Sequence, residues 1–405
     1  MDHSASDHRR GLTILLIFTL FMVIGFDMIM PLVIGRYVND IGFTATAVAV
    51  ALAIRQFSQQ GLALVGGGLA DRFDVRTLIG FGVLLRAIGF GVLAFAADYA
   101  VLIIAMILIG FGGVLFEMPY QAAIAILTTE KNRSRYYSLN NTITGIGSAV
   151  GPLLGVALLR FDFMWVCFGA AFCFIINFVI ALFVMPPVKR TTESYAPVKA
   201  IRTIISDKSY LTFVLTMIVF WLAAAQIDIS YPLKAQELAN SADGVGIMYT
   251  IYAVVYAALQ YPLVALVLRK LSPRQSSVLG IIVIASALFL TAFVQTSSLF
   301  MVIVAIYAIG MLLARPNQQN IAVSMSNPRA IGMYLGVNSL AFAIGKGFGT
   351  ILGGAAVDFA KNSGASSLPW YAFSIIAVLA ALSFAFHKRI GKPHQSTENA
   401  DVIAD

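Results

Sequence analysis

Seven ionisable side chains lie inside long apolar stretches of the sequence, where a charge is hard to accommodate. They comprise three carboxylates and four basic groups: Asp27, Glu117, Asp228, Arg55, Arg86, Arg315 and Lys346. A charge at the centre of a bilayer costs about 2.5–3.5 kcal/mol on insertion scales, so such groups face the protein interior, pair or lose their charge. A carboxyl group in a poorly hydrated site favours its protonated form and exchanges protons more readily near neutral pH. The set therefore predicts a proton-handling or ion-binding interior.

Asp27 is the leading candidate for proton coupling, because it lies about 16 residues, roughly 24 Å, into the first apolar stretch. Its alternative role is a structural ion pair, for instance with Arg55. Glu117 and Asp228 are further proton-coupling candidates, although Asp228 lies near the end of its stretch and can reach water. We expect the basic groups Arg55, Arg86, Arg315 and Lys346 either to hold these carboxylates or to contact an anionic substrate.

Further polar and aromatic residues in the apolar stretches are candidates for lining a cavity. They are Asn140, Asn141, Gln226, Tyr252, Tyr256 and Asn338. Tyr252 and Tyr256 are four positions apart, which places them on one face of a helix.

The amino-acid composition limits the class of protein that positions these residues. Of 405 residues, 59% are hydrophobic and 11% are charged, whereas a soluble domain carries about 25% charged residues. This excludes a soluble enzyme, a disordered chain and a secreted disulfide scaffold. The two cysteines, Cys167 and Cys173, share one apolar stretch and indicate no disulfide framework and no metal site.

Twelve apolar stretches are long enough for membrane-spanning helices, which need about 20 residues each. They are 11–37, 44–70, 77–97, 100–127, 136–159, 164–185, 209–232, 244–268, 276–295, 298–325, 331–357 and 369–386. The longest interior polar stretch divides them six and six. We therefore predict an all-α integral membrane protein with a six-helix bundle in residues 1–185, a cytoplasmic linker in 186–208 and a second six-helix bundle with a short cytoplasmic tail in 209–405.

The two halves of the sequence resemble each other. Landmarks recur about 200 positions later in the same order: Asp27-x-x-x-Pro31 as Asp228-x-x-x-Pro232, Pro119 as Pro316, and Gly147-x-x-x-Gly151-x-x-x-Gly155 as Gly345-x-x-x-Gly349-x-x-x-Gly353. Internal repeats of this kind build transporters that bind their substrate between the repeats near the bilayer midplane.

The distribution of Lys and Arg predicts the orientation of the chain. Basic residues concentrate in the loops on the side of both termini, and the opposite loops carry only Arg36, Arg160, Lys234 and Lys361. Cytoplasmic loops are the ones enriched in Lys and Arg. Both termini are therefore expected in the cytoplasm, and the net charge of +8 reflects topology and not a nucleic-acid partner.

Two motifs resemble those of a transporter family. The loop after the second stretch reads Gly67-Gly68-Leu69-Ala70-Asp71-Arg72-Phe73-Asp74-Val75-Arg76, and the fifth stretch carries Gly147-x-x-x-Gly151-Pro152-x-x-Gly155. With twelve spans in two repeats, the chain resembles the major facilitator superfamily, from about Gly11 to Arg389. At closer range, Arg55-Gln-Phe-x-Gln59-Gln60-Gly61 and Phe161-Asp162-Phe163 resemble the drug:proton antiporter-1 family of bacterial multidrug efflux proteins.

The resemblance implies roles for both motifs. Gly67, Asp71, Arg72 and Arg76 are expected to form a conformational latch at the cytoplasmic side, with ordinary loop charge as the alternative. Gly147, Gly151, Pro152 and Gly155 match the glycine-proline motif of the antiporters, and simple helix packing is compatible with the same pattern.

The sequence also departs from the family pattern. Asp74 stands in place of the second loop glycine, Val156 replaces the last glycine of the fifth stretch, and Met106 occupies the place of an arginine often found in the fourth stretch. The missing arginine puts the usual proton-relay arrangement of the fourth stretch in doubt.

The resemblance implies a secondary transporter in the bacterial inner membrane that exports amphipathic drug-like compounds in exchange for protons by alternating access. It is expected to act as a monomer, with the proton gradient as energy source and with no cofactor, metal or nucleic-acid partner. The alternative is proton-coupled transport of one specific metabolite, such as a sugar, a siderophore or an amino-acid derivative. A membrane-embedded enzyme is disfavoured because the apolar stretches contain no histidine, and a sensor because the sequence contains no sizeable soluble domain.

Overall fold

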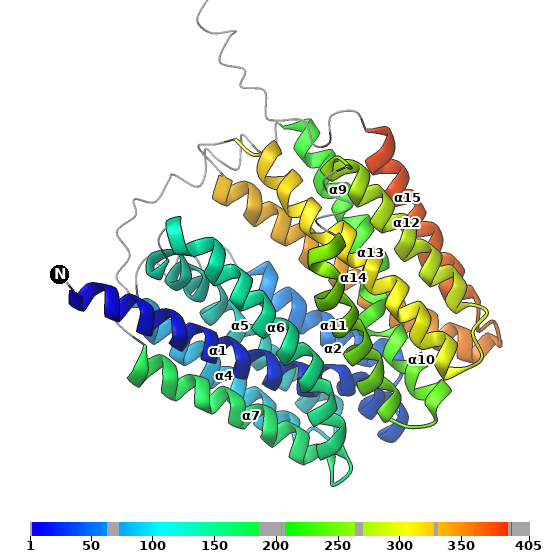
Figure 1. Cartoon of the computed structure of the whole chain (residues 1–405). Helices are drawn as coiled ribbons and strands as arrows, with labels where there is room; N and C mark the ends of the chain where they lie inside the picture. The colour runs from blue at the N-terminus through cyan, green and yellow to red at the C-terminus, as the bar shows by residue number, and fades with distance from the viewer. Residues whose placement is uncertain are drawn as a thin grey trace, which may run out of the picture.

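The computed structural model describes residues 2–62, 73–128, 130–185, 204, 207–263, 270–327, 331–387 and 390. All regular secondary structure in these ranges is helical (Figure 1), as predicted. The first part of the chain contains α1 (Asp2–Gly35), η1 (Arg36–Asp40), α2 (Ala45–Gln56), η2 (Phe57–Gly61), α4 (Val75–Leu93), α5 (Tyr99–Leu127), α6 (Glu130–Leu159), α7 (Phe163–Val179) and η3 (Ile180–Val184). The second part contains α9 (Lys208–Ala224), η4 (Ala225–Asp228), α10 (Ser230–Ala239), α11 (Asp243–Leu263), α12 (Pro273–Thr291), α13 (Ser297–Met325), α14 (Ile331–Ser363) and α15 (Leu368–Phe386).

Ten helices within the described ranges are long and apolar enough to cross a membrane. The other two predicted spans, 44–70 and 244–268, coincide with α2 and η2 and with α11. Both spans continue into residues outside the described ranges. Most of the predicted linker at 186–208 also lies outside these ranges.

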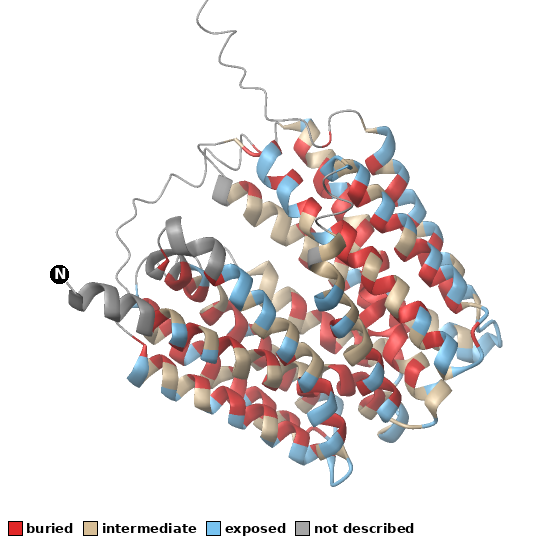
Figure 2. Cartoon of the chain, in the orientation of Figure 1, coloured by how far each residue is buried: buried red, intermediate tan, exposed pale blue. Residues whose placement is uncertain are grey.

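The helices form two groups, which we call the first bundle (α1 to α7) and the second bundle (α9 to α15) (Figure 1). Buried apolar side chains form two clusters that follow the same division, apart from Ile229 and Val245, which join the cluster of the first bundle. Figure 2 shows buried residues inside each bundle and exposed residues on the outward faces. Large apolar side chains such as Phe161, Phe183 and Phe386 are exposed, as expected for a surface that faces lipid.

Polar residues cap the N-termini of several helices and help to fix where these helices begin. Asp98 accepts a hydrogen bond from the Val101 backbone at the start of α5. Ser272 and Gln275 form a reciprocal capping box at the start of α12. Such caps satisfy backbone N–H groups that have no partner within the helix.

Glycines allow the equivalent helices α6 and α14 to lie close to their neighbours. A Cβ atom at Gly151 would come within 3.1 Å of the Asp27 Cβ in α1. A Cβ atom at Gly349 would come within 2.7 Å of the Leu222 Cα in α9. The small residues therefore bring the backbones of α1 and α6, and of α9 and α14, into close contact.

The two bundles meet through α2 against α14 and α6 against α11. Polar contacts also join them. In one of these, Asp358 near the end of α14 accepts hydrogen bonds from the backbone N–H groups of Ala45 at 2.9 Å and Thr46 at 2.8 Å, and from the Thr46 hydroxyl at 2.5 Å. A carboxylate at a helix N-terminus is stabilised by the unpaired N–H groups there. Asp358 thus joins the bundles at the end of the molecule opposite the start of α1.

Candidate functional site

The seventh predicted span is interrupted where its aspartate lies. The α-helix α9 ends at Ala224, the 3-10 turn η4 ends at Asp228, and α10 begins at Ser230. The Tyr249 hydroxyl donates to the Ile227 carbonyl oxygen at 3.0 Å and holds this turn. Interrupted helices at the interface of two repeats commonly form binding sites in transporters.

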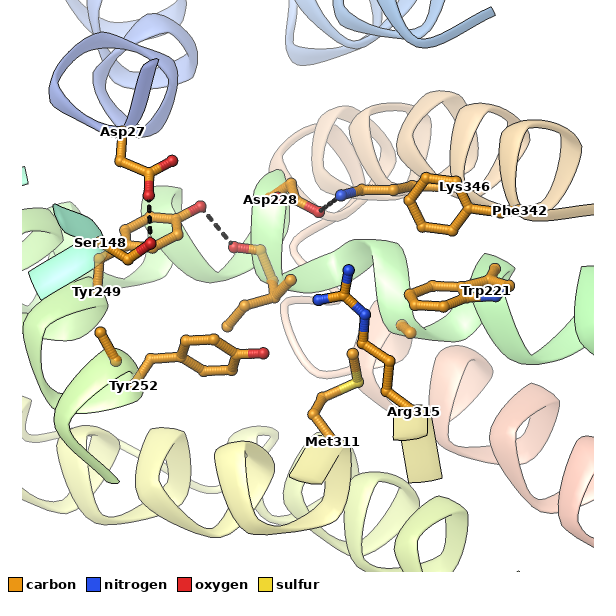
Figure 3. Close-up of a pocket in the computed structure, with 13 residues that line it drawn as sticks. Asp27, Ser148, Trp221, Asp228, Tyr249, Tyr252, Met311, Arg315, Phe342 and Lys346 are labelled. Carbon is orange, nitrogen blue, oxygen red and sulfur yellow. Dashed lines mark hydrogen bonds and ion pairs between the residues drawn. The ribbon is translucent and has the colours of Figure 1, made fainter. Parts of the chain in front are cut away.

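A cavity of about 250 Å³ lies between the two bundles at this break (Figure 3). The first bundle contributes side chains from α1 and α6, and the second bundle contributes the rest from α9, η4, α11, α13 and α14. The labelled lining residues are Asp27, Ser148, Trp221, Asp228, Tyr249, Tyr252, Met311, Arg315, Phe342 and Lys346. Four of the seven predicted intramembrane charges therefore meet in one cavity.

Asp228 and Lys346 form an ion pair in this cavity. The Lys346 Nζ lies 3.0 Å from an Asp228 carboxylate oxygen and 5.4 Å from the centre of the Phe342 ring. Lys346 was predicted to pair with an intramembrane carboxylate or contact a substrate, and it contacts Asp228. The pair contributes no net charge to the cavity.

Asp27 has a different partner. The Ser148 hydroxyl on α6 donates to the Asp27 carboxylate at 2.6 Å (Figure 3). Within the described ranges, no basic side chain forms an ion pair with Asp27, so the structure does not contain the alternative ion pair with Arg55.

Arg315 projects into the cavity from α13, close to Met311 (Figure 3). Among the residues that the structure describes, none accepts a hydrogen bond from its guanidinium group or forms an ion pair with it. A cation in this position attracts a negatively charged ligand group.

The other three predicted charges lie in a separate cluster inside the first bundle. Gln59 bridges two of them: its side-chain oxygen accepts from Arg55 at 3.1 Å and its nitrogen donates to Glu117 at 2.9 Å. Gln60 also donates to Glu117, at 3.2 Å. The sequence did not indicate which of the seven charges meet, and these three do not line the cavity.

Arg86 is buried among aromatic rings of the same bundle. Its guanidinium carbon lies 5.2 Å from the ring centre of Phe26, 4.8 Å from that of Phe116 and 5.8 Å from that of Phe174. Its Nε donates to the Ile109 carbonyl at 3.2 Å. These cation–π contacts stabilise the charge without a carboxylate in direct contact.

The residues predicted to line a cavity lie in different parts of the structure, and not all of them line it. Tyr252 lines the cavity, and its ring stacks on Tyr256 with centres 6.1 Å apart. Gln226 is buried and binds the Gly349 carbonyl at 3.1 Å, so it joins α14 to η4 and does not line the cavity.

The three predicted asparagines also lie away from this lining. The Asn140 oxygen accepts from Thr19 at 2.9 Å, Asn141 is exposed and Asn338 is half-buried.

Sequence reasoning missed several lining residues, namely Ser148, Trp221, Met311 and Phe342. For Ser148 a signal existed. It directly follows Gly147, as Lys346 directly follows Gly345, so the repeat places Ser148 opposite Lys346.

The predicted latch lies mostly outside the described residues, which do not include Gly67, Asp71 and Arg72. Arg76 is described, and its guanidinium donates to the Met185 carbonyl at 3.4 Å.

The antiporter motif has a clear packing role. A Cβ at Gly147 would meet Val23 in α1, at Gly151 it would meet Asp27, and at Gly155 it would meet Met28. Pro152 lies within the same helix. The motif therefore holds α6 against the part of α1 that carries Asp27.

Comparison with known proteins gives consistent matches over the whole chain. The family model described as Major Facilitator Superfamily matches residues 15–234 and 212–404. The chain is 33% identical to "Multidrug resistance protein MdtH" of Aeromonas hydrophila over 383 residues, which is 94% of this chain and 96% of that protein. It is also 33% identical to the protein of the same name from Salmonella arizonae over 401 residues, 98% of each chain.

Solved structures share the fold at low sequence identity. A POT family transporter in complex with 5-aminolevulinic acid superimposes with a TM-score of 0.79 at 14% identity, over 95% of this chain and 97% of that one. A bacterial homologue of the human lysosomal transporter Spinster, in an inward-facing and unoccupied conformation, gives a TM-score of 0.75 at 12% identity, over 96% and 99%.

Proposed function

Because this chain belongs to the Major Facilitator Superfamily and is a multi-pass membrane transporter for a small molecule, not an enzyme, we propose that it exports amphipathic drug-like compounds in exchange for protons. The name of its relatives, multidrug resistance protein, supports a drug-like substrate. The proposal places the protein in the bacterial inner membrane, with both termini in the cytoplasm and with one chain as the functional unit.

The observation that carries the proposal is the unequal state of the two aspartates in the cavity. Asp228 is neutralised by Lys346, whereas Asp27 is bound only by the Ser148 hydroxyl among the described residues. Asp27 is therefore the carboxylate whose charge is available to a proton or to a cationic ligand group.

Exchange follows from competition at Asp27. When Asp27 is ionised, it attracts a cationic group of the substrate, and when it binds a proton, that attraction is lost. Because the cavity takes side chains from both bundles, rocking of residues 1–185 against residues 209–405 would open it to one side of the membrane and then to the other. A proton entering from outside thus replaces a substrate leaving the cell.

The test is Asp27→Asn in inverted membrane vesicles from an efflux-deficient host. Asparagine keeps the size of the side chain and removes the titratable group, so we expect substrate-induced proton movement to fall to background while folded protein remains in the membrane. Asp40→Asn is the matched control, because Asp40 lies in η1 and pairs with Arg36 at an exposed site. Normal proton movement in the Asp27 variant would contradict the proposal.

A drug-susceptibility panel in the same host tests the breadth of export. Protection by the wild type and not by Asp27→Asn is the expected result. Protection against none of the drugs would contradict multidrug export and favour the transport of one specific metabolite.

A further inference from the structure

The cavity contains two charges that no described residue neutralises, and they have opposite sign. The carboxylate of Asp27 comes from the first bundle and the guanidinium of Arg315 from the second (Figure 3). The other two charges, on Asp228 and Lys346, are paired with each other at 3.0 Å. The site is neutral in total and dipolar in arrangement.

The remaining walls suit a flat apolar body. Trp221, Tyr252 and Phe342 present aromatic surfaces, and Met311 adds a flexible one. Aromatic and methionine side chains accommodate apolar ligands of varied shape. The planar guanidinium of Arg315 can donate two parallel hydrogen bonds to a carboxylate.

Proton exchange restricts which charged ligand fits. A purely anionic ligand at Arg315 would bind more tightly when Asp27 is protonated, so ligand and proton would move together. A ligand with a cationic group at Asp27 competes with the proton, as exchange requires. A ligand that carries both charges satisfies Asp27 and Arg315 at once and still competes with the proton.

From this arrangement, and resting on the proposed function, we propose that the preferred substrates are amphoteric aromatic compounds. Their cationic nitrogen binds Asp27 and their carboxylate binds Arg315.

Two dyes provide a matched test, because rhodamine 123 is the methyl ester of rhodamine 110 and lacks its free carboxylate. Binding of each dye to purified full-length protein in lipid nanodiscs is measured by fluorescence anisotropy. We expect Arg315→Gln to weaken rhodamine 110 binding roughly tenfold or more, as for the loss of a charge-assisted hydrogen bond. The same variant should change rhodamine 123 binding less than about twofold.

Two further variants control the measurement. Arg160→Gln removes an exposed arginine that pairs with Asp243 at 3.7 Å and does not line the cavity, and it should change the binding of neither dye. Arg315→Lys keeps the charge without the planar fork and should retain part of the preference for rhodamine 110. Equal weakening of both dyes by Arg315→Gln, or failure of the wild type to bind rhodamine 110, would overturn the inference.

The same dyes separate this inference from the proposed exchange. Proton movement that accompanies rhodamine 123 transport, without any carboxylate-dependent effect of Arg315→Gln on binding, would overturn the amphoteric site and leave the exchange intact. Carboxylate-dependent binding of rhodamine 110 without proton movement would support the site and overturn the exchange.

Discussion

The two bundles place an aspartate at equivalent repeat positions and give it chemically different partners. Asp27 and Asp228 each precede a proline by four residues. In both bundles the partner directly follows the first glycine of the repeated Gly-x-x-x-Gly-x-x-x-Gly motif: it is Ser148 on α6 in the first and Lys346 on α14 in the second. The same backbone arrangement therefore presents a hydroxyl group on one side of the cavity and an ammonium group on the other.

This difference changes what each aspartate can do. A hydroxyl group donates to an ionised carboxylate and accepts from a protonated one, so Ser148 can bind Asp27 in both states. An ammonium group is positively charged and only donates, so protonation of Asp228 would leave the charge of Lys346 without its counter-charge. We infer that a single partner residue suits one repeat to the proposed proton exchange and the other to a fixed charge pair.

The strongest way to break the asymmetry is Ser148→Lys, which makes the two bundles alike. The new ammonium group would hold Asp27 as an ion pair, and we expect substrate-induced proton movement in inverted vesicles to fall to background. Ser148→Thr keeps a hydroxyl group and is the matched control, with most of the activity retained. Unchanged coupling in a folded Ser148→Lys protein would show that the partner does not set the role of the carboxylate.

The converse change, Lys346→Ser, leaves Asp228 without its cation. We expect a loss of about 1–3 kcal/mol in stability, because an uncompensated charge remains in a partly enclosed site. Thermal unfolding of the purified protein measures the effect. The double variant Lys346→Ser/Asp228→Asn should recover most of it, and a double variant no more stable than the single one would contradict the explanation.

The glycine-rich helices offer a smaller test of the same comparison. A Cβ at Gly349 would lie 2.7 Å from the Leu222 Cα, whereas the nearest atoms to a Cβ at Gly151 are 3.1 Å away. Gly349→Ala should therefore cost about 1–3 kcal/mol by overpacking, and Gly151→Ala should cost less. The ranking of the two thermal midpoints checks this, and the reverse ranking would show that α1 and α6 are the more tightly packed pair.

The sequence predicted much of this architecture because the membrane imposes strict conditions on it. The length of the apolar stretches indicated the helices, and the helical fold is confirmed. The resemblance to the superfamily and to bacterial multidrug resistance proteins is confirmed as well. The cost of intramembrane charge picked out all four charged residues of the cavity, which are Asp27, Asp228, Arg315 and Lys346.

The sequence contains less information about which of the intramembrane charged residues contact each other. The prediction included Arg55, Arg86 and Glu117 with the cavity charges as intramembrane ionisable groups, and these three do not line the cavity. Helix periodicity does not reveal which face of a helix turns toward which neighbour when most faces are apolar. The roles of all these residues in proton coupling and substrate binding, and the halves as separate moving units, stay predictions.

The hydrogen bonds of Asp358 with the start of α2 join residues 312 and 313 positions apart, and they have a consequence for the balance between conformations. A hydrogen bond to a charged group contributes about 1.5–3 kcal/mol, and 1.4 kcal/mol is a factor of about ten in an equilibrium constant. Each such bond that is lost when the bundles separate at this end changes the population ratio of the joined and the separated conformation about tenfold. A ligand in the cavity reverses the ratio only if its affinities for the two states differ by a larger factor. The Asp358 carboxylate thus helps to set how much more tightly a transported compound must bind one conformation than the other.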